Sequence, residues 1–179
     1  MNYQEAIKML KLHLMPPANP WRSRRDEAGG DLFQTDEGFI DLQEILTAYG
    51  VGWINEYLKL YSPVAKDKES NLFDKTEEFK KIVFSLPESD GGIGLIRRLL
   101  VENRRLCVVW GGSINGETLL LDGERGAVSE RVFLVSADMD VVTYWCSAAE
   151  FLFNLVCGRI KGEFFSPEFH MPHTFRSGV

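Results

Sequence analysis

Apolar residues recur at helical spacing in several segments of the chain, and stretches rich in glycine, proline and charge separate these segments. Side chains at positions i, i+3, i+4 and i+7 lie on one side of an α-helix, so this spacing predicts helices with one buried face. The pattern predicts a helix near the N-terminus and further helices over 41–50, 54–61, 75–86 and 147–158. For the helix over 75–86, the expected buried residues are Phe79, Ile82, Val83 and Leu86.

Capping residues mark where two of these helices begin. Asp41 with Glu44, and Ser147 with Glu150, have the spacing of a capping box, in which each side chain bonds the other residue's backbone N–H. Gly158 stands where the last helix should end. The helices over 41–61 and 147–158 should pack on a sheet and bury Leu46, Tyr57, Phe151 and Leu155.

The C-terminal half changes to short apolar runs, at 106–110, 118–121, 132–135 and 141–146. Short apolar runs at regular spacing, with turn residues between them, are typical of an antiparallel meander. Asp138 and Asp140 fit the turn between the last two runs, because Asp readily bonds nearby backbone groups. Residues 93–105 fit a short helix as well as a strand, and the pattern does not decide between them.

These elements predict an α+β fold with one mixed or antiparallel sheet, its strands mainly in residues 106–146, packed with about four to five helices. The 179 residues suit a single domain. Residues 1–38 are expected to form an N-terminal helix and an irregular arm, and residues 39–179 the α+β domain.

The glycine-rich stretch WGGSINGETLLLD, Trp110 to Asp122, is the most distinctive local pattern. Its glycines lack the spacing of a phosphate-binding loop, and an apolar strand follows instead of a helix. Asn115-Gly116 between two apolar runs predicts a tight hairpin of type I′, which needs positive φ at both residues. Gly111-Gly112 is expected to mark a bulge or bend just before the hairpin tip.

Composition and charge argue against some classes of function. The formal net charge of −6 argues against a general nucleic-acid binder, which needs a basic surface. No apolar stretch is long enough for a membrane span and no secretory signal is recognisable, so we expect a cytoplasmic protein without membrane contact. The cysteines Cys107, Cys146 and Cys157 lie in apolar surroundings and are interpreted as buried thiols in a reducing compartment.

The sequence contains no recognisable catalytic or metal-binding motif, so we expect no enzyme activity, no cofactor and no metal. His170 and His173 are separated by Pro172, which disfavours a helical ligand pair. Trp145, next to the last helix, is expected in the core.

Several motifs together resemble the SUKH superfamily, which includes bacterial immunity proteins of polymorphic toxin systems and a yeast cell-wall synthesis regulator. A strand ending in Trp-Gly, a turn with Asn-Gly and an acidic residue, and a following apolar strand carry the resemblance. Ser113-Ile114 depart from the family's usual Thr and polar residue. The matching positions are Trp110-Gly111, Asn115-Gly116-Glu117, the strand through Leu121, 49–58, Glu150-Phe151-Leu152, Leu155, Gly158 and 164–169.

The resemblance implies a non-enzymatic protein-binding domain, with an immunity protein that blocks a toxin domain as the leading interpretation. A regulatory or scaffold module of the same superfamily is the alternative, and a hydrolase built from scattered carboxylates is a third. Toxins that act on nucleic acid need a basic surface, and an acidic surface here would speed their encounter. A solubilising acidic face explains the same carboxylates equally well. The expected partner-binding residues near the hairpin are Trp110, Asn115, Glu117, Asp122 and Glu124. For Trp110, burial in the core is an equally good interpretation.

Overall fold

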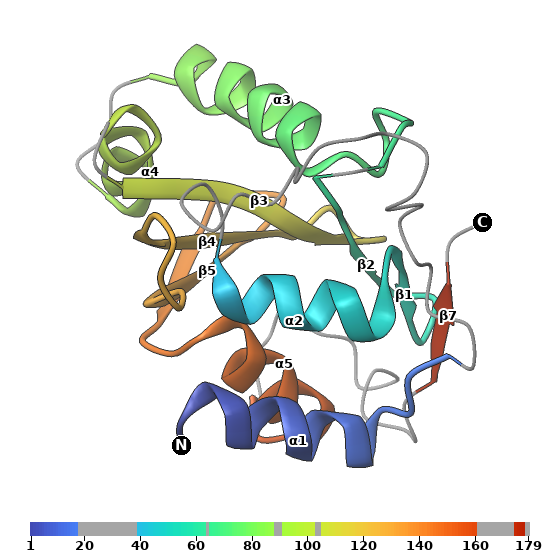
Figure 1. Cartoon of the computed structure of the whole chain (residues 1–179). Coiled ribbons are helices and arrows are strands. Elements are labelled where there is room, and N and C mark those ends of the chain that lie inside the picture. Colours follow the sequence, from blue (N-terminus) through green and yellow to red (C-terminus); the bar gives the residue numbers. More distant parts are fainter. Residues whose placement is uncertain (18–38, 64, 88–90, 103–104, 161–173, 178–179) are drawn as a thin grey trace.

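The computed structural model shows an antiparallel sheet with helices packed on both of its faces (Figure 1). The structure describes residues 1–17, 39–63, 65–87, 91–102, 105–160 and 174–177. Within these ranges the helices are α1 (Tyr3–His13), α2 (Ile40–Tyr49), α3 (Leu72–Ser85), α4 (Gly92–Val101) and α5 (Ala148–Val156). The strands are β1 (Gly52–Ile54), β2 (Leu58–Leu60), β3 (Arg105–Ser113), β4 (Thr118–Glu124), β5 (Arg131–Val135), β6 (Val141–Tyr144) and β7 (Phe175–Ser177).

The strands lie in the order β6-β5-β4-β3-β2-β1-β7, and each neighbouring pair is antiparallel. β3 to β6 form a meander, because each strand pairs with the next one along the chain. β2 joins the β1–β2 hairpin to β3, and β7 pairs with β1 at the far edge. The expected α+β fold and the meander over 106–146 are confirmed.

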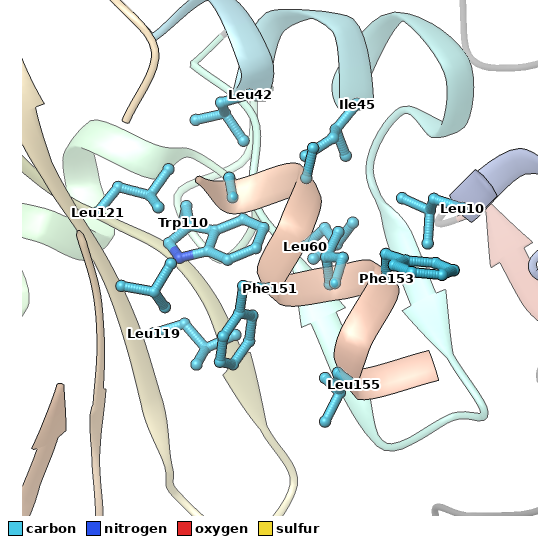
Figure 2. Close-up of a cluster of buried hydrophobic side chains, with 14 of the residues drawn as sticks. Leu10, Leu42, Ile45, Leu60, Trp110, Leu119, Leu121, Phe151, Phe153 and Leu155 are labelled. Carbon is cyan, nitrogen blue, oxygen red and sulfur yellow. The ribbon is translucent and has the colours of Figure 1, made fainter. Parts of the chain in front are cut away.

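Side chains along each strand point alternately to the two faces of the sheet, and each face packs into its own hydrophobic core. The first core lies between the sheet and α1, α2 and α5, and the second between the sheet and α3 and α4 (Figure 1). Trp110 and Phe151 meet edge to face in the first core, with their ring centroids 6.2 Å apart (Figure 2). Leu46, Tyr57, Phe151 and Leu155 are buried, as expected.

The segment 54–61, expected as a helix, is instead the hairpin β1–β2. Asn55 and Glu56 have φ of 53° and 57°, and Tyr57 N donates to Ile54 O at 3.0 Å. Positive φ at both central residues is the geometry of a type I′ turn, which matches the twist of the flanking strands. The spacing of apolar residues wrongly predicted a helix here, because Ile54 and Leu58 are cross-strand partners that face the same core.

Asp41 does not form the expected capping box with Glu44. Its side chain is fully buried and accepts hydrogen bonds from Ser129 N, at 2.9 Å, and from Ala148 N, at 2.7 Å. Ala148 is the first residue of α5, so the carboxylate satisfies a free N–H of that helix and meets its positive end. Asp41 therefore caps a different helix and joins α2, the β4–β5 loop and α5.

The remaining helices agree with the sequence in part. α5 begins after Ser147, whose side chain accepts from Glu150 N, while the Glu150 carboxylate lies 3.6 Å from the N-terminal amine of Met1. In α3, Phe79 and Val83 are buried, but Ile82 is exposed and Leu86, which follows the helix, is only half-buried. The ambiguous segment 93–105 divides between α4 and the start of β3.

Candidate functional site

Three turns meet at one end of the sheet. We call this region the hairpin end, made of residues 55–57, 113–117 and 136–140, which connect β1 to β2, β3 to β4, and β5 to β6. Ile114 N donates to Tyr57 O at 3.0 Å, which joins the first turn to the second. A Cβ on Gly116 would lie 3.4 Å from the Ala137 Cβ, so the second and third turns also touch.

The β3–β4 turn lies at Asn115-Gly116 as expected, but its type is different. Ser113 N donates to Glu117 O at 2.9 Å and Gly116 N donates to Ser113 O at 3.2 Å. Gly116 has φ of 90°, whereas Asn115 is not among the described residues with positive φ. This is a three-residue loop that ends in a left-handed residue, rather than a two-residue type I′ turn.

A bulge lies beside this hairpin. The register between β3 and β4 shifts between Val109 and Gly111, which leaves Trp110 as the extra residue of β3. The expected bulge near Gly111-Gly112 is therefore confirmed. Lys59 O would lie only 3.0 Å from a Cβ on Gly111, so the glycine lets β2 approach closely.

The β5–β6 turn repeats the hydrogen bonds of the β3–β4 turn. Ser136 N donates to Asp140 O at 2.9 Å, and Met139 N donates to Ser136 O at 3.0 Å. Met139, with φ of 68°, takes the place of Gly116. Asp138 and Asp140 lie in this turn, as expected, and both are exposed.

A buried carboxylate organises the hairpin end. Ser113 Oγ donates to Glu117 Oε2, and Tyr57 OH lies 3.4 Å from the same oxygen. Asn115 Nδ2 donates to Tyr57 OH at 2.8 Å, and Asn115 N donates to Ser113 Oγ at 3.1 Å. Glu117 thus receives both hydroxyl protons while Asn115 orients both hydroxyl oxygens.

Burial raises the pKa of the Glu117 carboxyl above its ordinary value. Hydrogen bonds from its own backbone N–H and from Tyr57 offset part of this increase, because they favour the charged form. Glu117 therefore contributes a fixed hydrogen-bond acceptor inside the turn more than a surface charge.

The residues expected to form one partner-binding surface do not lie together. Trp110 has 0% of its surface exposed and belongs to the first core, so it offers no anchor to a partner. Asn115 is exposed and Glu117 is buried at the hairpin end. Asp122 and Glu124 lie towards the other end of β4, so the expected acidic cluster is wrong. Extended strand rises about 3.3 Å per residue, which carries the later carboxylates away from the turn.

Asp122 is a structural carboxylate. It is fully buried and accepts two bonds of 2.9 Å from the Arg105 guanidinium and one of 2.7 Å from Arg131 Nε. Its hydrogen bonds raise the pKa of the Arg105 guanidinium, so this arginine stays charged. Removing one member would leave an uncompensated charge in the sheet.

Trp145 is exposed, contrary to expectation. It follows β6 at the edge of the sheet and has 78% of its surface exposed. The Arg131 guanidinium lies 5.0 Å from the centroid of its ring, within the range of a cation–π contact. An exposed tryptophan beside an ordered arginine was not recognised from the sequence, although its position directly after an edge strand was a usable signal.

The exposed surface of the hairpin end is acidic with an apolar centre. Ile114, on the middle of the three turns, has 63% of its surface exposed, and Glu56, Asp138 and Asp140 are exposed on the two neighbouring turns. Glu56 pairs with Arg176 at 3.0 Å, whereas Asp138 and Asp140 form no ion pair with any part of the chain that the structure describes.

The thiols differ in their environment. Cys107 is buried and burial raises the pKa of its thiol to about 12, so it is not a thiolate at neutral pH. Cys146 and Cys157 are half-buried, so the expected full burial holds for Cys107 alone. A pocket of about 280 Å³ between α3, α4 and β3 has Cys107 among its lining residues.

The described ranges hold no cluster of His, Cys, Asp or Glu that could bind a metal ion. They also contain no helix of the length and apolar character needed to cross a membrane. Residues 18–38 of the expected N-terminal arm, His170, His173 and the segment 164–169 lie outside the described residues.

Comparison with known proteins gives no match, whether to family models, to curated proteins or to solved structures. The fold and the hairpin end therefore define this chain only as an α+β protein with an ordered group of turns at one end of its sheet.

Proposed function

We propose that the chain is a non-enzymatic protein-binding module, and specifically an immunity protein that neutralises a basic toxin domain. One observation carries the proposal, namely that hydrogen bonds fix the hairpin end while Ile114 and the carboxylates of Asp138 and Asp140 remain exposed on it. An ordered surface loses little conformational entropy on binding, so more of its contact energy becomes affinity.

The charge of the hairpin end favours a basic partner. Asp138 and Asp140 are not neutralised by cations of the described chain, so they add a local negative potential. Such a potential speeds the encounter with a positively charged domain and disfavours acidic partners. Ile114 supplies the apolar contact that was expected of Trp110.

The first step identifies the gene that neighbours this one, and a neighbour that encodes no toxin domain would contradict the immunity role. Where the neighbour encodes a basic toxin domain, its binding rates to this chain are measured at low and high salt. The double variant Asp138→Lys with Asp140→Lys should slow association, and Ile114→Asp should speed dissociation. The control Glu102→Lys with Glu124→Lys makes the same change in charge at exposed positions remote from the hairpin end. Binding that all folded variants retain unchanged would place the interface elsewhere.

Neutralisation separates the immunity role from a scaffold role. An immunity protein abolishes the toxin's activity at equal concentration, whereas a scaffold module binds a partner without inhibiting it. Turnover of a phosphodiester, peptide or glycoside substrate by the chain alone, lost on replacing one Asp or Glu, would contradict the non-enzymatic proposal.

A further inference from the structure

β6 is an edge strand of the sheet. β5 pairs with one side of it, and no strand of the described chain pairs with the other side. Edge strands are commonly protected by proline, by charged side chains or by bulges. β6 has the sequence Val-Val-Thr-Tyr, followed directly by Trp145, and carries none of these features.

The β5–β6 turn determines which backbone groups of β6 point outward. Ser136 N donates to Asp140 O, and in an antiparallel pair bonded and non-bonded residue pairs alternate from that point. Val142 and Tyr144 are therefore bonded to their partners on β5. The N–H and C=O groups of Val141 and Thr143 point away from β5, towards the open edge.

The side chains of β6 leave apolar surface on both faces of the sheet. Val141 packs on the second core and shares that face with Thr143 and Trp145, because strand residues alternate. Val142 and Tyr144 pack on the first core, and both remain half-buried. Trp145 is largely exposed and is held by Arg131, whose Nε donates to Asp122 at 2.7 Å.

We propose that β6 pairs with β6 of a second copy of this chain, in an antiparallel ladder centred on Thr143. In this register Val141 faces Trp145 of the partner subunit, Val142 faces Tyr144 of the partner subunit, and Thr143 faces the partner subunit's Thr143. β-branched–aromatic and Thr–Thr pairs are among the favourable cross-strand pairs. In this ladder the hydrogen-bonded residue pairs are those that contain Val141 and Thr143, whose backbone N–H and C=O groups point outward.

The sequence of the strand favours a second copy over an unrelated strand. Val-Val-Thr-Tyr-Trp is self-complementary about its threonine, which is the requirement of a two-fold symmetric interface. The pairing places the acidic β5–β6 turns at opposite ends of the joined ladder, so Asp138 and Asp140 of the two copies do not face each other. The two hairpin ends stay free, and the dimer does not depend on the proposed function.

Sedimentation velocity of the full chain over a range of concentrations tests the dimer. The unchanged chain should show a reversible monomer–dimer equilibrium. Thr143→Lys places two like charges opposite each other at the axis and should raise the dissociation constant about tenfold or more. Thr143→Pro should have the same effect, because it removes an N–H that bonds only across the interface.

Two controls match these variants. Ile82→Lys introduces the same charge at an exposed apolar position of α3 and should leave the equilibrium unchanged. Thr143→Val retains the backbone groups and the β-branched shape, so it should dimerise. Circular dichroism establishes that each variant is folded. A chain that is monomeric at all concentrations, or a folded Thr143→Lys variant that dimerises as well as the unchanged chain, would overturn the proposal.

Discussion

Gly116 and Met139 occupy the same position in two loops that share one hydrogen-bond pattern, and both have positive φ. A residue with a Cβ is strained there by roughly 1–2 kcal/mol, which glycine avoids. Gly116→Ala should therefore lower the free energy of unfolding by about 1–2 kcal/mol in urea denaturation.

Ile114→Ala, in the same loop, is the control for that substitution. Ile114 is exposed and is not among the described residues with positive φ, so its truncation should change stability by about 0.5 kcal/mol or less. Equal effects of the two substitutions would contradict the loop geometry.

Glu117 makes the stability of the hairpin end depend on pH. Its pKa is raised in the folded protein, so protonation favours the folded state. This contribution is complete below the unfolded pKa of about 4.3, and it is lost as pH rises through the higher folded pKa. Glu117→Gln should remove this pH-dependent contribution, while the amide oxygen of the glutamine still accepts hydrogen bonds from Ser113 and Tyr57.

Urea denaturation of both proteins over a series of pH values measures this effect. The stability of the Gln variant relative to the unchanged chain should increase as pH rises through the folded pKa and then level off. A difference that stays constant with pH would show that Glu117 has the same pKa in both states.

Among the structural elements, α2 and α5 are joined by the buried carboxylate of Asp41. Both of its oxygens accept hydrogen bonds, so in Asp41→Asn the amide nitrogen must face a donor. We expect a loss of about 2–4 kcal/mol in the free energy of unfolding, measured by chemical denaturation. Glu44→Gln should cost about 0.5 kcal/mol or less. A similar loss in both variants would instead support a capping box.

The meander over β3 to β6 could be predicted because alternation and turn residues are local signals. The segment 54–61 could not, because Ile54, Tyr57 and Leu58 have the spacing of a helix. In the structure Ile54 and Leu58 face one core from two strands, and Tyr57 joins that core from the turn between them. Asp41 has the spacing of a local cap, yet its partners Ser129 and Ala148 are remote in sequence.

The sequence predicts the hairpin turn of the candidate site, but it does not predict which side chains are exposed around that turn. Asn115-Gly116 marks a hairpin from sequence alone. Which carboxylates lie at the same end of the sheet depends on strand length and on the neighbouring turns. Asp138 and Asp140 lie in the adjacent β5–β6 turn, whereas Asp122 lies within β4. Trp145 was expected in the core but is exposed, because it follows an edge strand, and Trp110 is buried rather than available to a partner.

At the scale of the whole molecule, the same sheet contributes side chains to both cores. The consecutive residues Leu119 and Leu120 point into different cores. Each is fully buried, so Leu119→Ala and Leu120→Ala should each lower the free energy of unfolding by about 2–5 kcal/mol. Because both cores share the backbone of β4, both variants should unfold in one transition.

Far-UV circular dichroism and tryptophan fluorescence, followed through the same urea titration, test this cooperativity. Leu12→Ala, at an exposed position of α1, should leave the transition in place. Separate transitions for the two signals in Leu120→Ala would show that α3 and α4 unfold independently of the first core.

The bonds of Asp41 also set an order of events while the chain is being synthesised. Its partners Ser129 and Ala148 follow it by 88 and 107 residues. At about 5–20 residues per second, Ala148 is added roughly 5–20 s after Asp41. During that interval α2 has no donor for its carboxylate and cannot complete its docking. The connection between α2 and α5 is therefore made only after the strands β3 to β6 have been synthesised.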